Sequence, residues 1–158
     1  MQIGTANAAA VVALYGPPDA EGWFFGDRSY PPSHALGYEC VRKRDDDRWP
    51  VTNSGPWCRT VFWVDPATGE LGDFFTSSRR FVAEHGVRVG MPTVVAERLL
   101  HRHAQGGCSD AINRDDLTIW FAGDTLWQLP SNELRVIGGH VDSFFLVNPR
   151  GELGIFDC

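Results

Sequence analysis

The segment FWVDPATGELG, residues 62–72, carries the strongest structural signal in the chain, because it returns near the end as FLVNPRGELG, residues 145–154. In both copies an apolar run leads into an Asp-Pro or Asn-Pro turn, and a glycine then starts a second run. Upstream, an Ala/Val-rich stretch over 3–14 has a counterpart over 89–100, each opened by an Ile-Gly or Val-Gly pair. Each half is therefore predicted to form a helix first and antiparallel strands after it.

This duplication divides the 158 residues into two units of roughly 80 residues, near the lower limit of size for independent folding. We expect an α+β fold of two tandem repeats, each a short helical segment packed on an antiparallel β-sheet. The first repeat is predicted over 1–78 and the second over 87–158, with a linker over 79–86. Repeats of this size are expected to need each other for stability.

The composition is that of an ordinary folded protein, with 43% apolar and 22% charged residues. No stretch approaches the roughly 20 apolar residues that a membrane-spanning helix requires. The net charge of −6 argues against a nucleic-acid partner, because neutralising phosphates requires clustered Lys and Arg. An acidic surface of this kind suits a basic partner better.

Four cysteines, an even number in a small chain, are typical of an oxidising compartment. None of their spacings forms a Cys-x-x-Cys pair, which argues against zinc. Of the three pairings that four cysteines allow, we expect Cys40–Cys58 and Cys108–Cys158, because each then stays within one half. Four reduced cysteines in a cytosolic protein are the alternative. No signal peptide precedes the first repeat, so a secreted protein is expected here in its mature form.

In the first half, Thr5 or Asn7 is expected to cap a short helix that ends at Gly16-Pro17-Pro18. The sequence from 19 to 55 is loop-like. Within it the Asp45–Asp47 triplet is expected to be a solvated hairpin tip flanked by its own arginines, with a bound cation as the alternative.

The predicted strand over 57–65 has two different faces, because side chains alternate along a strand. One face, with Cys58, Thr60, Phe62 and Val64, is expected to pack in the core. The other face combines two tryptophans with an arginine, a composition typical of protein-binding hot spots. This second face consists of Trp57, Arg59, Val61 and Trp63, and further strands are predicted over 71–77 and 37–43.

In the second half, Pro92 is expected at the first position of a helix that ends before Gly106-Gly107. Gly138-Gly139 is expected to form a two-residue turn between the last two strands. Alternation along the last strand then leaves His140 and Phe144 opposite the core, matching the tryptophan face of the first half. Strands are predicted over 117–122, 126–129, 134–137 and 140–147.

No constellation in the sequence supports catalysis, so we expect no enzyme activity, no metal and no cofactor. His101 and His103 point away from each other on a helix, which argues against a metal ion shared between them and Cys108. Ser109 lacks the Gly-x-Ser-x-Gly turn that presents a serine nucleophile. Cys58 and His140 are predicted on opposite faces and do not form a nucleophile pair. No glycine motif for phosphate or dinucleotide binding is present.

The chain contains six tryptophans, which is more than two small cores comfortably bury. A sheet covered by one short helix leaves its other face open, and we expect that face to bind a partner. The alternative is that most of the tryptophans are core or loop residues. The aromatic members of the expected surface are Trp57, Trp63, Trp120, Trp127 and Phe144.

The pattern resembles the tandem-repeat β-lactamase inhibitory protein family and the related small outer-membrane-assembly lipoprotein domains. The likeness lies in the two helix starts, Ile3-Gly4-Thr5 and Val89-Gly90-Met91, in the Gly16-Pro17-Pro18 exit, and in the Trp/Phe-rich strands, and it covers nearly the whole chain. It implies two units whose sheets form a concave aromatic surface that grips a protruding loop of a partner protein. On that surface the resemblance places Trp57, Arg59, Trp63, Trp120, His140 and Phe144.

These features predict a non-enzymatic protein-binding module, an inhibitor or immunity-type protein of bacterial origin. Its partner is expected to be another protein, such as a β-lactamase or a toxin. The alternative is a cell-envelope structural or assembly domain, or a carrier that holds a small apolar ligand. A secreted or cell-envelope location is expected, with the cytoplasm as the alternative.

Overall fold

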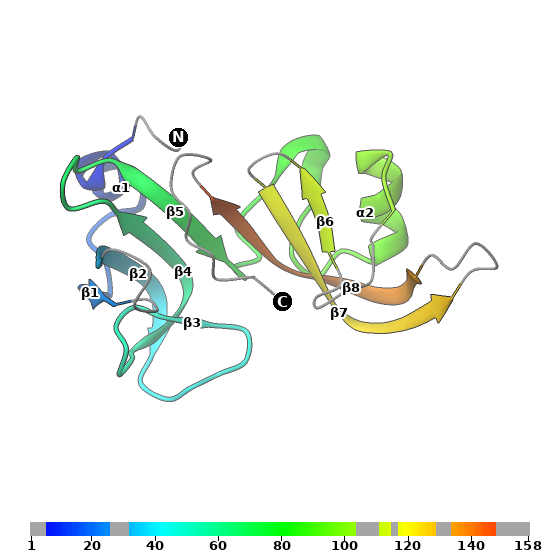
Figure 1. Ribbon diagram of the computed structural model, residues 1–158, viewed down its shortest axis with the longest axis horizontal. Helices are drawn as coiled ribbons and strands as arrows, with labels where there is room; N and C mark the ends of the chain where they lie inside the picture. Colours follow the sequence, from blue (N-terminus) through cyan, green and yellow to red (C-terminus); the bar gives the residue numbers. More distant parts are fainter. Residues whose placement is uncertain (1–5, 26–31, 104–110, 115–116, 129–133, 148–158) are drawn as a thin grey trace. The chain divides into compact units, whose positions relative to one another are not determined.

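The computed structural model describes residues 6–25, 32–103, 111–114, 117–128 and 134–147. The chain divides into two compact units, with the main boundary between Thr76 and Ser77. Each unit combines a helix with antiparallel strands (Figure 1), which confirms the α+β class. The predicted repeat limits of 1–78 and 87–158 and the linker over 79–86 stay predictions.

The first unit consists of helix α1 and a sheet with the strand order β1-β2-β4-β5, in which the short β3 also pairs with the start of β4. All of these pairings are antiparallel. Strands β1 and β2 lie in the stretch from 19 to 55 that the sequence suggested was largely loop-like, and β2 overlaps the strand predicted over 37–43. The bounds are α1 Ala8–Tyr15, β1 Ala20–Phe24, β2 Ser33–Val41, β3 Trp49–Pro50, β4 Trp57–Val64 and β5 Leu71–Thr76.

Helix α1 begins and ends where the sequence predicts. The side chain of Asn7 accepts a hydrogen bond from the Ala10 N–H at 2.9 Å, so Asn7 is the cap of the two candidates. Gly16 ends the helix with a φ of 85°, a left-handed conformation that glycine adopts without steric cost. The helix contains no charged residue, and Val11 is its buried side chain.

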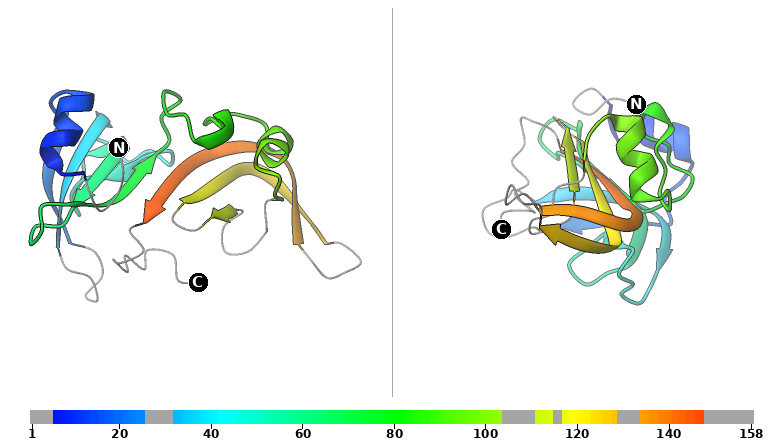
Figure 2. Two further views of the ribbon diagram at one scale, coloured as in Figure 1. Left: turned by 90° about the horizontal axis from the view of Figure 1, so that it is seen from above. Right: turned by 90° about the vertical axis from the view of Figure 1, so that its right-hand side faces the viewer.

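One face of the first sheet packs against α1, and we call it the helix-side face (Figure 2). Tyr15 contacts Phe62 and Tyr38, with ring centroids 5.0 and 5.6 Å apart. Phe62 in turn lies 4.8 Å from Phe74 between ring centroids. The burial predicted for four side chains of β4 is confirmed: Cys58, Thr60, Phe62 and Val64. Val61 and Trp63 of the other predicted face are buried as well.

The opposite, loop-side face is covered by the chain segment 49–56. The Trp63 ring meets Trp49 and Phe24 edge-on at centroid distances of 6.2 and 6.1 Å. Trp49 also packs 5.5 Å from Phe75. The expectation that this sheet leaves its second face open is wrong, because the long segment after β2 folds back across it.

Small residues on β1 and β2 let the 49–56 segment approach the sheet closely. A Cβ atom on Gly37 would lie 2.3 Å from the Val51 Cγ2 and 2.5 Å from the Cys58 Sγ. A Cβ atom on Gly22 would lie 2.6 Å from the Thr52 Cγ2. Real Cβ atoms essentially never lie so close to another atom, so a larger residue at either position would force the covering segment or the strand to shift.

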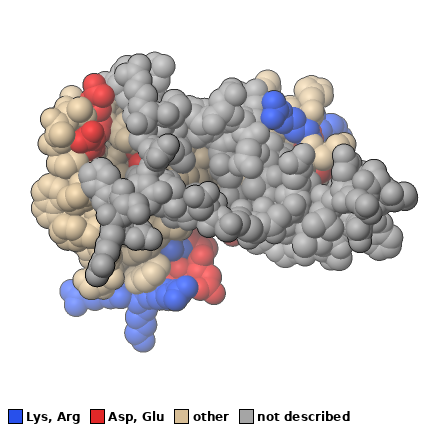
Figure 3. Space-filling view, in the orientation of Figure 1, with Lys and Arg blue, Asp and Glu red and all other residues tan. Residues whose placement is uncertain are grey.

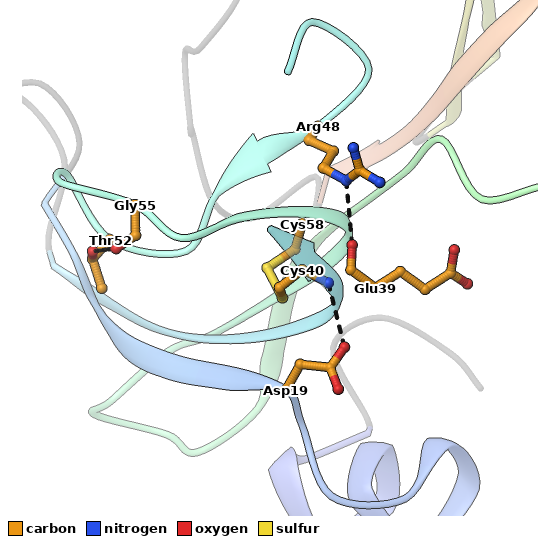
Figure 4. Close-up of a disulfide and its surroundings, with 7 residues drawn as sticks. All are labelled: Asp19, Glu39, Cys40, Arg48, Thr52, Gly55 and Cys58. Carbon is orange, nitrogen blue, oxygen red and sulfur yellow. Dashed lines mark hydrogen bonds between the residues drawn. A yellow bond between two sulfur atoms is a disulfide. The ribbon is translucent and has the colours of Figure 1, made fainter. Parts of the chain in front are cut away.

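The Cys40–Cys58 disulfide joins β2 to β4 (Figure 4). The two residues are direct partners in the antiparallel pairing, so this part of the predicted pairing is confirmed. Cys108 and Cys158 lie outside the described residues. A disulfide is typical of proteins outside the reducing cytosol.

The second unit places helix α2 on a sheet with the strand order β8-β7-β6. Helix α2 starts directly after Pro92, and His101, in a left-handed conformation with φ of 53°, ends it well before Gly106-Gly107. No helix in the described ranges is long and apolar enough to cross a membrane. The bounds are α2 Thr93–Leu100, the 3-10 turn η1 Glu84–Gly86, β6 Ala111–Arg114, β7 Leu117–Gln128 and β8 Leu134–Val147.

Two strand predictions in the second unit are wrong. Gly138-Gly139 does not form a hairpin turn but lies inside β8, which is one continuous, curved strand (Figure 2). Both glycines have the positive φ angles of such a turn, 90° and 65°, but β8 continues beside the long β7 instead of reversing. The strands predicted over 117–122 and 126–129 are likewise a single strand, β7.

The core of the second unit lies between α2 and the strands. Ala96 and Leu100 of α2 pack in one cluster with Ile119, Val141 and Phe144. Val141 and Phe144 both belong to β8, and both are completely buried. This cluster gives the unit a hydrophobic core of its own.

We predict that Gly37→Ala lowers the free energy of unfolding by about 2 kcal/mol or more, because the new methyl group displaces Val51 or the disulfide. Gly72→Ala is the matched control in a strand, since its Cβ would meet the nearest atom at an ordinary 3.6 Å. Urea unfolding of the two variants measures the difference. Equal stability of both variants would show that the 49–56 segment does not pack on β2.

The disulfide generates a second stability prediction. Cys40 and Cys58 are separated by 18 positions in the sequence, and closing a loop of that length stabilises a protein by about 3 kcal/mol. The Cys40→Ala/Cys58→Ala double variant is expected to lose about that much in urea unfolding relative to the oxidised protein. A loss below about 0.5 kcal/mol would contradict a structural role for this disulfide.

Candidate partner-binding site

The structure does not bring the seven predicted partner-binding residues onto one open surface. Trp63 is 1% exposed and Phe144 is completely buried. The expectation of an exposed ring is wrong for both, because Trp49 and Phe24 cover Trp63 and helix α2 covers Phe144. The predicted surface therefore loses two of its aromatic members.

The other predicted residues have different surroundings. Trp57 and Arg59 remain half-buried at the start of β4, and His140 is exposed on β8. Trp120 and Trp127 belong to β7, but their side chains lie outside the described part of the structure. Of the predicted set, Trp57 and Arg59 form a partly exposed pair on one strand.

The loop after β2 completes a cluster around this pair. The Arg44 guanidinium carbon lies 5.6 Å from the centre of the Trp57 ring, within the range of a cation–π interaction. The Arg59 Nη2 lies 2.7 Å from the Asp47 Oδ2 in an ion pair. We call these residues, together with Arg48, the Trp57 patch.

The acidic triplet Asp45–Asp47 is neutralised by arginines, as the sequence predicts. Arg48 forms ion pairs with Asp45 and Asp47, and its Nε donates a hydrogen bond to the Glu39 carbonyl at 3.3 Å (Figure 4). Arg59 adds a second cation from β4. Among the described residues no group of three or more metal-binding side chains is found. Two members of the triplet, Asp45 and Asp47, are thus paired with arginines.

Desolvation raises the pKa of the Asp47 carboxyl above its ordinary value, and the adjacent Asp45 raises it further. The cations of Arg59 and Arg48 oppose the rise. On acidification the Asp47–Arg59 ion pair is therefore lost at a higher pH than a pair with an ordinary aspartate. The side chain of Arg59 is then less firmly held beside Trp57.

The loop also carries a charge opposite to that of the whole protein. Arg42, Lys43 and Arg44 are all exposed, and Figure 3 shows basic side chains gathered over this loop beside the acidic ones. Arg44 is a member of the site that the sequence did not predict, although a basic triplet directly before an acidic one is a visible signal. The Trp57 patch is thus a basic and aromatic site on an acidic chain.

A pocket of about 570 Å³ opens beside the patch, between the start of β1, the end of β2 and the turn before β4. Asp19 and Arg42 line the pocket together with Ser54 and Pro56. One carboxylate oxygen of Asp19 accepts a hydrogen bond from the Cys40 N–H at 3.3 Å (Figure 4). The pocket therefore presents both charges next to apolar walls, an arrangement that can hold a polar side chain of a partner.

Comparison with known proteins assigns this chain to no family. No family model matches the sequence, and no curated protein matches it either. Among solved structures, the chain is similar to the crystal structure of the uncharacterized protein yfeY from Escherichia coli, with 12% identity and a TM-score of 0.44. That match covers 81% of this chain and 80% of the other. A likeness of this size carries no argument about function.

The burial of Trp63 and the partial exposure of Trp57 predict effects of very different size for the same substitution. Trp63→Ala is expected to lower the free energy of unfolding by about 3–5 kcal/mol, because it empties a large buried site. Trp57→Ala is expected to cost about 1 kcal/mol or less. Chemical unfolding of both variants checks this, and a stable Trp63→Ala variant would show that the loop-side face is open after all.

Proposed function

We propose that this chain is a protein-binding module of the inhibitor or immunity type, not an enzyme, and that it contacts its partner through the Trp57 patch. The observation that carries the proposal is the stacking of Arg44 on Trp57 at 5.6 Å. Trp and Arg are among the side chains most enriched in binding hot spots. Here the two are already in contact before any partner arrives.

The rigidity of the patch also supports this proposal. Trp57 and Arg59 flank Cys58, whose disulfide fixes β4 to β2. The ion pair with Asp47 holds Arg59 at 2.7 Å. A preorganised site binds more tightly, because less conformational freedom is lost when the complex forms.

The neighbouring pocket adds a place for an anchoring side chain. Arg42 lines the pocket and directly precedes the exposed Lys43 and Arg44 of the loop. A partner residue that enters the pocket would meet Arg42 and Asp19 while the surrounding surface covers Trp57. Hot spots of this kind combine a filled pocket with aromatic contacts around it.

We further propose that the two units arose by duplication, as in the tandem-repeat β-lactamase inhibitory proteins that the sequence resembles. Helices Ala8–Tyr15 and Thr93–Leu100 have the same length and both precede antiparallel strands. The first copy of the repeated segment forms the β4–β5 hairpin, and the second copy continues beyond the described residues. A β-lactamase is one candidate partner, and the Cys40–Cys58 disulfide supports a secreted or envelope location.

We predict that Trp57→Ala and Arg44→Ala each weaken partner binding about 30-fold, which corresponds to roughly 2 kcal/mol. The partner is first captured from secreted and envelope fractions of the source organism, identified by mass spectrometry, and then titrated by calorimetry. Arg88→Ala serves as the matched control, because Arg88 is an exposed arginine of the second unit. Unchanged affinity in both patch variants, with the partner still bound, would exclude this surface.

A further inference from the structure

Helix α1 has an unusual distribution of apolar residues. A helix on a protein surface normally has one apolar and one polar face, whereas α1 reads AAAVVALY and has no polar face. Val11 points into the core, but Leu14 is 66% exposed, Tyr15 43% and Val12 37%. The helix therefore packs one apolar side on the sheet and presents another to solvent.

Strand β1 places another exposed apolar side chain on the same face of the sheet as α1. Trp23, which is 48% exposed, pairs with His34 of β2 and contacts its ring at 5.8 Å. His34 and Tyr38 lie on the same face of β2 because they are four residues apart, and Tyr38 contacts Tyr15 of α1. Trp23 is thus on the helix-side face. We call the set Val12, Leu14, Tyr15 and Trp23 the α1 surface.

Among the described residues, the charged side chains of the segment that forms α1 and β1 are acidic. Asp19 and Glu21 lie between α1 and Trp23 in the sequence, and Glu70 forms a bridge with Asn7 at the start of the helix. Neither the segment 6–25 nor the segment 60–78 contains a Lys or Arg. Figure 3 shows acidic side chains near α1 and the basic ones at the opposite end of the unit. An apolar surface with an acidic rim complements an apolar surface with a basic rim.

We propose that the α1 surface is a second docking surface and that its occupant is a basic amphipathic segment of a partner protein. The apolar side of such a segment would cover Leu14 and Trp23, and its Lys or Arg side chains would pair with Glu21 and Glu70. The proposal rests on the proposed function in assuming a protein partner. It uses a different surface from the Trp57 patch, so each of the two is tested by its own variants.

The test uses a defined probe, an amphipathic helical peptide of Leu and Lys (LKKLLKL repeated twice), with the Leu/Glu analogue as the control peptide. Leu14→Glu is compared with Val94→Glu, because Val94 is an exposed apolar residue of α2, 60% exposed. The two substitutions change the net charge equally, so simple electrostatic attraction predicts slightly tighter binding for both. Docking on the α1 surface predicts binding weakened about tenfold or more for Leu14→Glu, and binding unchanged or tighter for Val94→Glu.

Titration by calorimetry measures the affinity of each variant for the peptides, and circular dichroism confirms that each variant is folded. If Leu14→Glu unfolds, Leu14→Ser replaces it and is expected to weaken binding several-fold for the same reason. Binding of the Lys peptide that is equal or tighter in the Leu14 variants would overturn the proposal. A dimer of the wild type that Leu14→Glu dissociates would also overturn it, because a second copy would then cover the surface. Neither outcome affects the Trp57→Ala result, which tests the proposed function separately.

Discussion

The close packing of the 49–56 segment against Gly37 is the contact on which the first unit depends. Because Gly37 has no side chain, Val51 and the Cys40–Cys58 disulfide lie directly against β2. This contact holds the segment over the loop-side face, where Trp49 covers Trp63. The same segment leads into β4 and so determines where Trp57 and Arg59 emerge from the sheet. One close approach therefore both completes the core and positions the candidate site.

The first unit thereby acquires two surfaces of different chemistry. Around Trp57 the surface is aromatic and basic, and it is held rigidly by the disulfide and by ion pairs with Asp47. Around α1 it is apolar with an acidic rim. The two proposed docking surfaces differ in charge, so a basic partner would be repelled from the Trp57 patch and an acidic partner from the α1 surface.

The sequence predicted local structure well where the signals were local. Asn7, Gly16 and the alternation along β4 set the limits of α1 and of the core face, and the structure follows them. The predicted open aromatic face failed at Trp63, because its cover comes from a segment that looked like a loop and contributes few regular hydrogen bonds. Gly22 and Gly37 were the sequence signals that a segment covers this face. A glycine in a strand, however, indicates a close approach without identifying the segment that approaches. The hairpin turn predicted at Gly138-Gly139 failed for a related reason, since two positive φ angles suit a hairpin turn and also a bend within one strand.

The packing of the 49–56 segment on β2 at Gly37 is tested most directly by proton NMR. Nuclear Overhauser effects are expected between the Val51 methyl groups and the α protons of Gly37, together with effects between the rings of Trp49 and Trp63. Their observation in the oxidised protein would establish the covering layer that buries Trp63. If these effects were absent and the Val51 methyl groups were accessible to a soluble paramagnetic probe, the loop-side face would be open and the account contradicted.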